Sequence, residues 1–79
     1  MQTVFELTAT ARRHADAQDL LAALARIVPD PMLQRGDIVE IVTAEGVETF
    51  IVHQRRLRYG ADGSPRWVIE LDHPARARS

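Results

Sequence analysis

Arginines beside aromatic residues are the part of this sequence best suited to binding chemistry. The run HQRRLRY spans residues 53–59, and Arg66 and Trp67 follow after a short glycine-containing loop. On a sheet, such arginines can contact phosphates while aromatic rings stack on bases, and the same cations can bind an acidic protein surface. The candidate binding residues are therefore Arg55, Arg56, Arg58 and Arg66.

Charge favours a protein partner over nucleic acid. Ten basic and eleven acidic residues leave a formal net charge of −1, so no overall field draws the chain toward nucleic acid or an anionic membrane. Glu70 and Asp72 on the adjoining segment weaken the potential near the arginines, and we expect Tyr59 and Trp67 to lie in the core. An acidic protein partner is thus the first hypothesis, and nucleic-acid binding through the four arginines is the alternative.

The residues that most often carry catalysis are scattered along the chain. His14 precedes the expected helix, His53 lies in an expected strand and His73 is near the C-terminus, so no spacing directs them to one metal or nucleophile. There is no cysteine, which excludes a thiolate metal site, and the glycines fall at turns without a phosphate-loop pattern. We therefore expect a protein that is not an enzyme and holds no metal or cofactor.

The N-terminal half predicts one strand and one helix. Aromatic and β-branched residues favour a strand over Gln2–Thr10, and residues 12–15 form a polar connection. From Asp16 to Val28, apolar residues recur at spacings of three and four, which indicates an amphipathic helix that the prolines of the connector Pro29–Gly36 end. The first ten residues lack the features of a signal peptide or membrane anchor, so the cytoplasm of a bacterium is the expected location.

A tight turn joins the first two strands of an antiparallel meander within residues 37–72. The strands cover Asp37–Thr43 and Val47–Tyr59, and the connection is either a turn at residues 45 and 46 or a longer loop of the same register. The resulting register brings four apolar residues together on one face, with Ile41 opposite Phe50 and Val39 opposite Val52.

The loop at residues 60–64 determines the register of the last hairpin. If it closes with Tyr59 opposite Pro65, Leu57 pairs with Trp67, and Ile69 and Leu71 share the same face. Phe50 and Val52 lie at even positions and reach that face only if the strand contains one extra residue. We therefore predict a β-bulge within residues 53–56.

Apolar residues also gather on the outward face of the predicted sheet, where no helix covers them. They are Ile38, Val42, Ile51 and Val68. Either the sheet curls into a partly closed SH3-like barrel that the N-terminal strand covers in part, or two copies of the chain pack together. The run RGDIVEI at residues 35–41 resembles the opening strand of many SH3-like barrels, a resemblance that covers these residues only and identifies no family.

These patterns predict a single α+β domain over residues 1–79, of β-α-β-β-β order, with one helix on a curved antiparallel sheet and a frayed tail at residues 73–79. A domain this small gains much from a second layer, so we expect a homodimer. The expected function is that of a non-enzymatic interaction module that self-associates through its sheet and presents the arginines to a partner. The predicted core is Phe5, Leu7, Leu20, Leu24, Ile27, Val39, Ile41, Phe50, Val52, Leu57, Trp67, Ile69 and Leu71.

Overall fold

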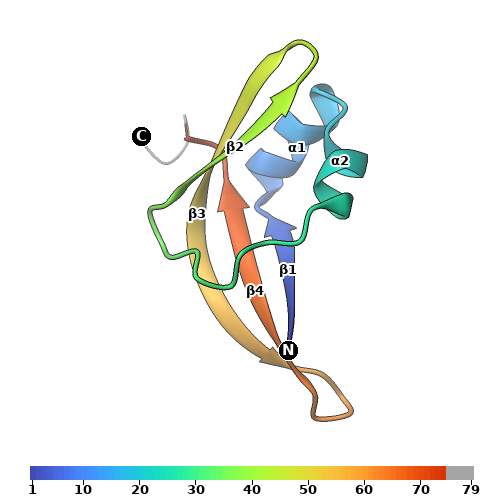
Figure 1. The fold of residues 1–79 in the computed structure, drawn as a ribbon, viewed down its shortest axis with the longest axis vertical. Coiled ribbons are helices and arrows are strands. Elements are labelled where there is room, and N and C mark those ends of the chain that lie inside the picture. The colour runs from blue at the N-terminus through green and yellow to red at the C-terminus, as the bar shows by residue number, and fades with distance from the viewer. Residues whose placement is uncertain (75–79) are drawn as a thin grey trace.

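Two helices and a long connector lie on one face of a curved four-stranded sheet (Figure 1). The computed structural model describes residues 1–74. In chain order, the elements are β1 (Gln2–Leu7), α1 (Ala9–Ala17), α2 (Leu21–Arg26), β2 (Ile38–Thr43), β3 (Gly46–Tyr59) and β4 (Pro65–Asp72). The predicted α+β class and the curled, SH3-like sheet are confirmed.

The sheet is mixed, whereas the sequence predicted a wholly antiparallel one. Its strand order is β1-β4-β3-β2, and β1 runs parallel to β4 while the other neighbours are antiparallel. The helices and the connector return the chain toward the end of the sheet from which β1 started (Figure 1). As a result, β2 runs in the same direction as β1, and so does β4 at the end of the meander. β1 takes the edge position beside β4 and does not cover the outer face.

The helical region begins earlier than predicted. Thr8 caps α1, because its hydroxyl accepts a hydrogen bond of 3.1 Å from the backbone N–H of Ala11. Ala11 and Ala15 are fully buried, so α1 packs against the sheet through small side chains that a search for large apolar residues overlooks. Residues 12–15, which we expected to form a connection, therefore belong to a helix.

The predicted single helix over Asp16–Val28 is wrong because the chain breaks between α1 and α2. Asp19 has a positive φ of 57°, and the N–H of Leu20 donates to the carbonyl of Ala15 at 2.7 Å. The N–H of Asp19 donates to Asp16 at 3.1 Å, which completes a Schellman motif at the end of α1. Neither helix is long, and among the described residues no helix has the length and apolar character needed to cross a membrane.

The core lies between the two helices and the upper half of the sheet. Six predicted members are buried there, and four more pack against the core in part. Trp67, Leu57 and Ile27 do not belong to it, because β3 and β4 extend beyond the helices and Ile27 follows the end of α2. The buried cluster is Ala11, Ala15, Leu20, Leu24, Phe50, Val52, Ile69 and Leu71, with Phe5, Leu7, Leu21, Leu33, Val39 and Ile41 against it.

The register of the last hairpin and its bulge are confirmed. Tyr59 pairs with Pro65 and Leu57 with Trp67, and the register shifts by one residue between Val52 and Gln54. The bulged residue is therefore His53. It allows Val52, before the bulge, and Leu57 and Tyr59, beyond it, to lie on the same face of the sheet, as the sequence required.

The register of the first hairpin differs from the prediction by two residues. Val39 pairs with Phe50, and Ile41 pairs with Glu48 instead of Phe50, because Thr43 pairs with Gly46 and the turn is Ala44-Glu45. Gly46 has a φ of 138°, a conformation that other residues rarely adopt. A shift of two residues keeps each side chain on its face, so the predicted inner face of this hairpin survives the error.

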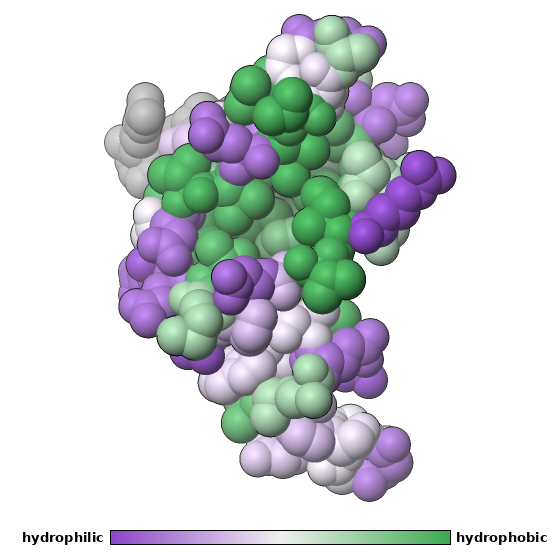
Figure 2. Space-filling model, viewed as in Figure 1, coloured by the Kyte–Doolittle hydropathy of each residue, from purple (hydrophilic) through white to green (hydrophobic). Residues whose placement is uncertain are grey.

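The far end of the β3–β4 hairpin projects beyond the helices (Figure 1). Figure 2 shows apolar side chains concentrated in the upper half of the molecule and more polar ones toward this projecting end. Tyr59, at the end of β3, is 66% exposed. Within residues 1–74, no second layer covers the inner face of the projecting end.

Candidate interaction surfaces

The four candidate arginines lie on two different faces of the sheet. Arg55 is on the inner face, where its guanidinium carbon lies 3.8 Å from the centroid of the Trp67 ring. Arg56, Arg58 and Arg66 point to the outer face, because side chains alternate along each strand after the bulge. The arginine patch that the sequence predicts is therefore not a single surface.

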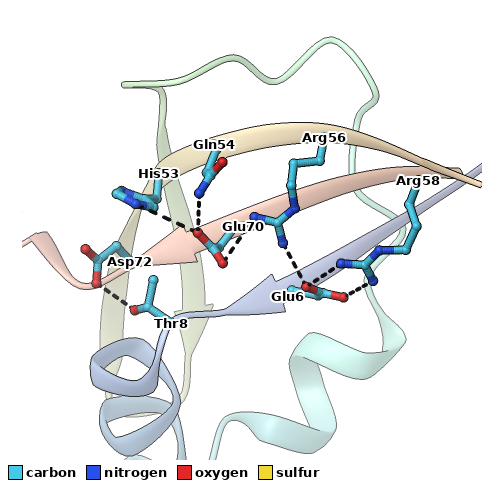
Figure 3. Close-up of polar contacts among 8 residues, drawn as sticks. All are labelled: Glu6, Thr8, His53, Gln54, Arg56, Arg58, Glu70 and Asp72. Carbon is cyan, nitrogen blue, oxygen red and sulfur yellow. Dashed lines mark hydrogen bonds and ion pairs between the residues drawn. The ribbon is translucent and has the colours of Figure 1, made fainter.

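Glu6 of β1 holds two of the outer-face arginines (Figure 3). A guanidinium nitrogen of Arg56 lies 3.0 Å from one Glu6 oxygen, and its other terminal nitrogen lies 3.5 Å from Glu70. Arg58 donates hydrogen bonds to both oxygens of Glu6. The hydrogen bond from Arg58 lowers the pKa of Glu6, burial opposes this effect, and the charges of both arginines add to it. The positive charge of Arg56 and Arg58 is thus offset within the chain.

Arg66 is the remaining arginine on the outer face. It lies directly opposite Arg58, and it forms no ion pair with another residue of the described part of the chain. Its charge makes a small contribution to the lowered pKa of Asp62, which results mainly from the side-chain hydrogen bond with Ser64. One unpaired cation beside an already paired one is a weak site for a phosphate backbone.

The other polar groups around this network also have partners. Gln54 donates to Glu70 at 3.4 Å, the ring of His53 lies 3.9 Å from the same carboxylate, and Thr8 donates to buried Asp72 at 2.7 Å (Figure 3). Within residues 1–74, no buried side-chain nitrogen or oxygen lacks a hydrogen-bond partner. The outer-face network is complete without a ligand, so we interpret it as part of the fold.

A second region of the outer face is apolar and exposed. In the β2–β3 hairpin, Ile38 pairs with Ile51 and Val42 pairs with Val47, with both pairs on the outer face. Ile38, Val42 and Val47 are 55%, 79% and 52% exposed. We call these four residues, Ile38, Val42, Val47 and Ile51, the hairpin patch. Three of them are the outward residues that the sequence singled out, and the fourth, Val47, lies opposite Val42, whereas the predicted register placed it opposite Ala44.

Val68 is the exception among the predicted outward residues. It lies on the outer face of β4, yet it is fully buried within this chain. Arg56 sits directly opposite Val68, and its guanidinium reaches Glu6 on the far side of β4, so the aliphatic stem of Arg56 crosses the sheet at this level. A partner therefore has no access to Val68, which belongs to the folded interior.

Two histidines are brought together, contrary to what their sequence positions suggested. His14 of α1 lies 2.9 Å from the Glu48 carboxylate, and its ring centroid is 4.2 Å from that of His73. The missed signal is the spacing of His14 and Ala15 from Ala11, since residues three and four apart on a helix lie on the same face. Once α1 is recognised, those buried alanines place His14 toward the sheet. His73 thus packs against the domain, and the rest of the tail that we expected to be frayed, residues 75–79, lies outside the described residues.

These histidines do not form a metal centre in the described structure. Among residues 1–74, no group of three or more histidine, aspartate or glutamate side chains is placed to hold a metal ion.

The chain matches no protein-family model, and no curated protein and no solved structure is significantly similar to it. Its function is therefore inferred from its own surfaces.

Proposed function

We propose that this protein is a non-enzymatic interaction module that self-associates through the hairpin patch. The observation that carries the proposal is that two facing aliphatic pairs, Ile38–Ile51 and Val42–Val47, lie on one side of the β2–β3 hairpin, where only Ile51 of the four is half-buried and the others are exposed. Exposed aliphatic pairs gathered on one face of a sheet are typical of an interface. The proposal does not depend on the arginines, because two of them already have partners within the chain.

A second copy of the chain fits this patch better than an unrelated partner would. A two-fold axis requires a surface that complements itself, and rows of aliphatic side chains of similar size can interlock with their own copies. In a domain of 79 residues, a second apolar layer also adds much to a small core. The hairpin patch provides such a layer on the face opposite the helices.

The two copies should stack face to face and not join edge to edge. Glu40 lies on the exposed face of β2, between the two aliphatic pairs and opposite Thr49. Antiparallel pairing of two β2 strands around their centre would bring the two copies of Glu40 opposite or diagonal to each other, which is unfavourable for like charges. In a face-to-face stack, Glu40 can turn from the edge strand into solvent.

Light scattering on the purified chain tests this proposal. We expect a wild-type dimer at both low and high salt, because burial of apolar surface is not screened, and a monomer for Val42→Asp. Met32→Asp is the matched control, since Met32 is 70% exposed and lies in the connector on the helix side of the sheet. Circular dichroism checks that each variant folds. A monomeric wild-type chain, or a folded Val42→Asp variant that stays dimeric, would refute the proposal.

Nucleic-acid binding is a second candidate, and one observation favours it. Trp67 and Tyr59 lie outside the core on the inner face of the projecting hairpin, with Arg55 over the Trp67 ring, so rings and a cation are present for stacking on bases. Trp67 fluorescence measured with oligothymidylate at low and high salt tests it. Quenching that salt abolishes and that Arg55→Ala weakens would favour this candidate, and the absence of quenching at low salt would eliminate it.

A further inference from the structure

A groove runs along β1 at the free edge of the sheet. It has a volume of about 650 Å³, and α2 with the residues that follow it forms the opposite wall. β1 is the last strand of the sheet, so one of its edges has no neighbouring strand (Figure 1). The groove is lined by Gln2–Leu7, Arg12, Leu21 and Leu24–Val28. Its floor is thus a strand of six residues that is paired on one edge and free on the other.

β1 lacks the features that usually protect an edge strand from pairing. Natural edge strands carry a proline, a bulge or charges that hinder the approach of another strand. β1 contains no proline and pairs with β4 without a register shift, and its one charged residue is Glu6. The carboxylate of Glu6 is engaged by Arg56 and Arg58 on the outer face. The edge can therefore accept backbone hydrogen bonds from a further strand.

The groove also has an excess of positive charge. Arg12 of α1 and Arg26 of α2 both line it, both are exposed, and neither forms an ion pair with another residue in the 1–74 range. Glu6 is the only acidic residue in the lining, and two other arginines engage it. The wall beside these cations is apolar and accessible, since Val28 is 83% exposed.

We propose that this groove binds an extended, acidic segment of a partner protein, which adds to β1 as a fifth strand. Main-chain hydrogen bonds to the free edge provide affinity, and side-chain sites along the strand provide specificity. Carboxylates of the segment lie at Arg12 and Arg26, and its apolar side chains pack on Val28 and the end of α2. The site is on a different surface from the hairpin patch, so the two proposals stand or fall separately.

A second copy of this chain is a poorer occupant of the groove. β4 carries the acidic residues Glu70 and Asp72, but it already has a neighbouring strand on each side. β4 of a second copy therefore has no free edge to pair with β1. β2 is free on one edge, but Glu40 is its only acidic residue. The charge of the groove therefore favours a segment from another protein that is richer in aspartate or glutamate.

Fluorescence anisotropy with three labelled decapeptides tests the proposal. One alternates valine with glutamate, the second replaces every glutamate by lysine, and the third keeps the glutamates but replaces alternate valines by proline, which removes backbone N–H donors. The Val42→Asp variant serves as the receptor alongside the wild-type chain, so that self-association through the hairpin patch does not affect the result. We expect only the first peptide to bind.

Variants of the groove arginines provide the second half of the test. The double variant Arg12→Glu/Arg26→Glu should bind the acidic peptide about tenfold more weakly or worse, whereas Arg13→Glu should bind like wild type. Arg13 is the matched control because it adjoins Arg12 on α1 and is exposed but does not line the groove. Amide chemical-shift changes on binding should concentrate in β1.

Three outcomes would overturn the proposal. The first is an acidic peptide that binds no better than the lysine peptide. The second is undiminished binding to the folded double variant. The third is a double variant that no longer self-associates although the wild-type chain does, which would show that the groove is occupied by a second copy.

Discussion

Arg56 on β3 reaches across β4 and places its guanidinium 3.0 Å from the carboxylate of Glu6 on β1. The same guanidinium contacts Glu70 of β4 on the way, and Arg58 binds Glu6 from the same side. β1 is the one strand of the sheet that no short turn connects to its neighbour, so it depends on contacts of this kind as well as on the backbone ladder. Arginines that the sequence suggests for a partner thus hold the edge strand of the fold.

The ion pairs of Glu6 predict a pH-dependent contribution to stability. Arg58 and Arg56 lower the pKa of Glu6 in the folded protein, so its stabilising effect is present above the pKa of the unfolded chain and is lost as the pH falls through the folded value. Glu6 is 37% exposed, which limits the effect through solvent screening. We expect Glu6→Gln to lower the free energy of unfolding by about 0.5 to 1 kcal/mol near pH 7 and by almost nothing near pH 3.

Urea unfolding of wild type and variant at the two pH values measures this difference. Glu45→Gln is the control, because Glu45 is exposed in the β2–β3 turn and forms no ion pair with any residue of the 1–74 region. Its effect should be close to zero at both pH values. A Glu6→Gln effect that persists in acid would mean that packing of the side chain, and not its charge, stabilises β1.

Replacement of valine by alanine should have a large effect on stability at Val68 and a small one at Val28. Val68 is fully buried under the stem of Arg56, so Val68→Ala should lower the free energy of unfolding by about 1 to 3 kcal/mol. Val28 is 83% exposed, and Val28→Ala should change the free energy of unfolding by less than about 0.5 kcal/mol. Chemical unfolding of both variants checks the contrast, and equal values would show that Arg56 does not seal the outer face.

The contacts that sequence reasoning predicted correctly are local ones. The β3–β4 register and the bulge at His53 follow from a short loop and from a period of two, so residues close in the chain determine them. The same reasoning placed Ile38 and Val42 on the outward face even though the turn before Val47 was misplaced, since a shift of two residues preserves the face.

The contacts that sequence reasoning missed join residues far apart in the chain. Glu6 lies 50 positions from Arg56, and His14 lies 34 positions from Glu48. No spacing rule identifies such partners until the order of strands is known, and the parallel pairing of β1 with β4 has no local signal. The arginine patch was therefore predicted from residue types, while its neutralisation by Glu6 was not foreseeable.

Trp67 should contribute less to stability than its size suggests. The sequence predicts that Trp67 lies in the core, and replacing a core tryptophan by alanine lowers the free energy of unfolding by about 3 to 5 kcal/mol. In the structure, Trp67 lies outside the buried cluster, and Arg55 covers one face of its ring. We expect Trp67→Ala to cost about 1 to 2 kcal/mol, against about 3 to 5 kcal/mol for Phe50→Ala, in parallel urea titrations. The reverse order would place the centre of the core at the projecting hairpin.

Substitutions at Asp19 distinguish the broken helix from the continuous one that the sequence predicts. Asp19 adopts a positive φ of 57° in the Schellman motif that ends α1, a conformation in which a Cβ atom costs about 1 kcal/mol for most residues. Asp19→Ala should therefore destabilise the protein by about 1 kcal/mol, and Asp19→Gly should leave it equally or more stable. In a continuous helix the order is inverted, because alanine is the best helix former and glycine among the poorest. The ranking of the three chains by thermal unfolding thus decides between the two structures without reference to the absolute values.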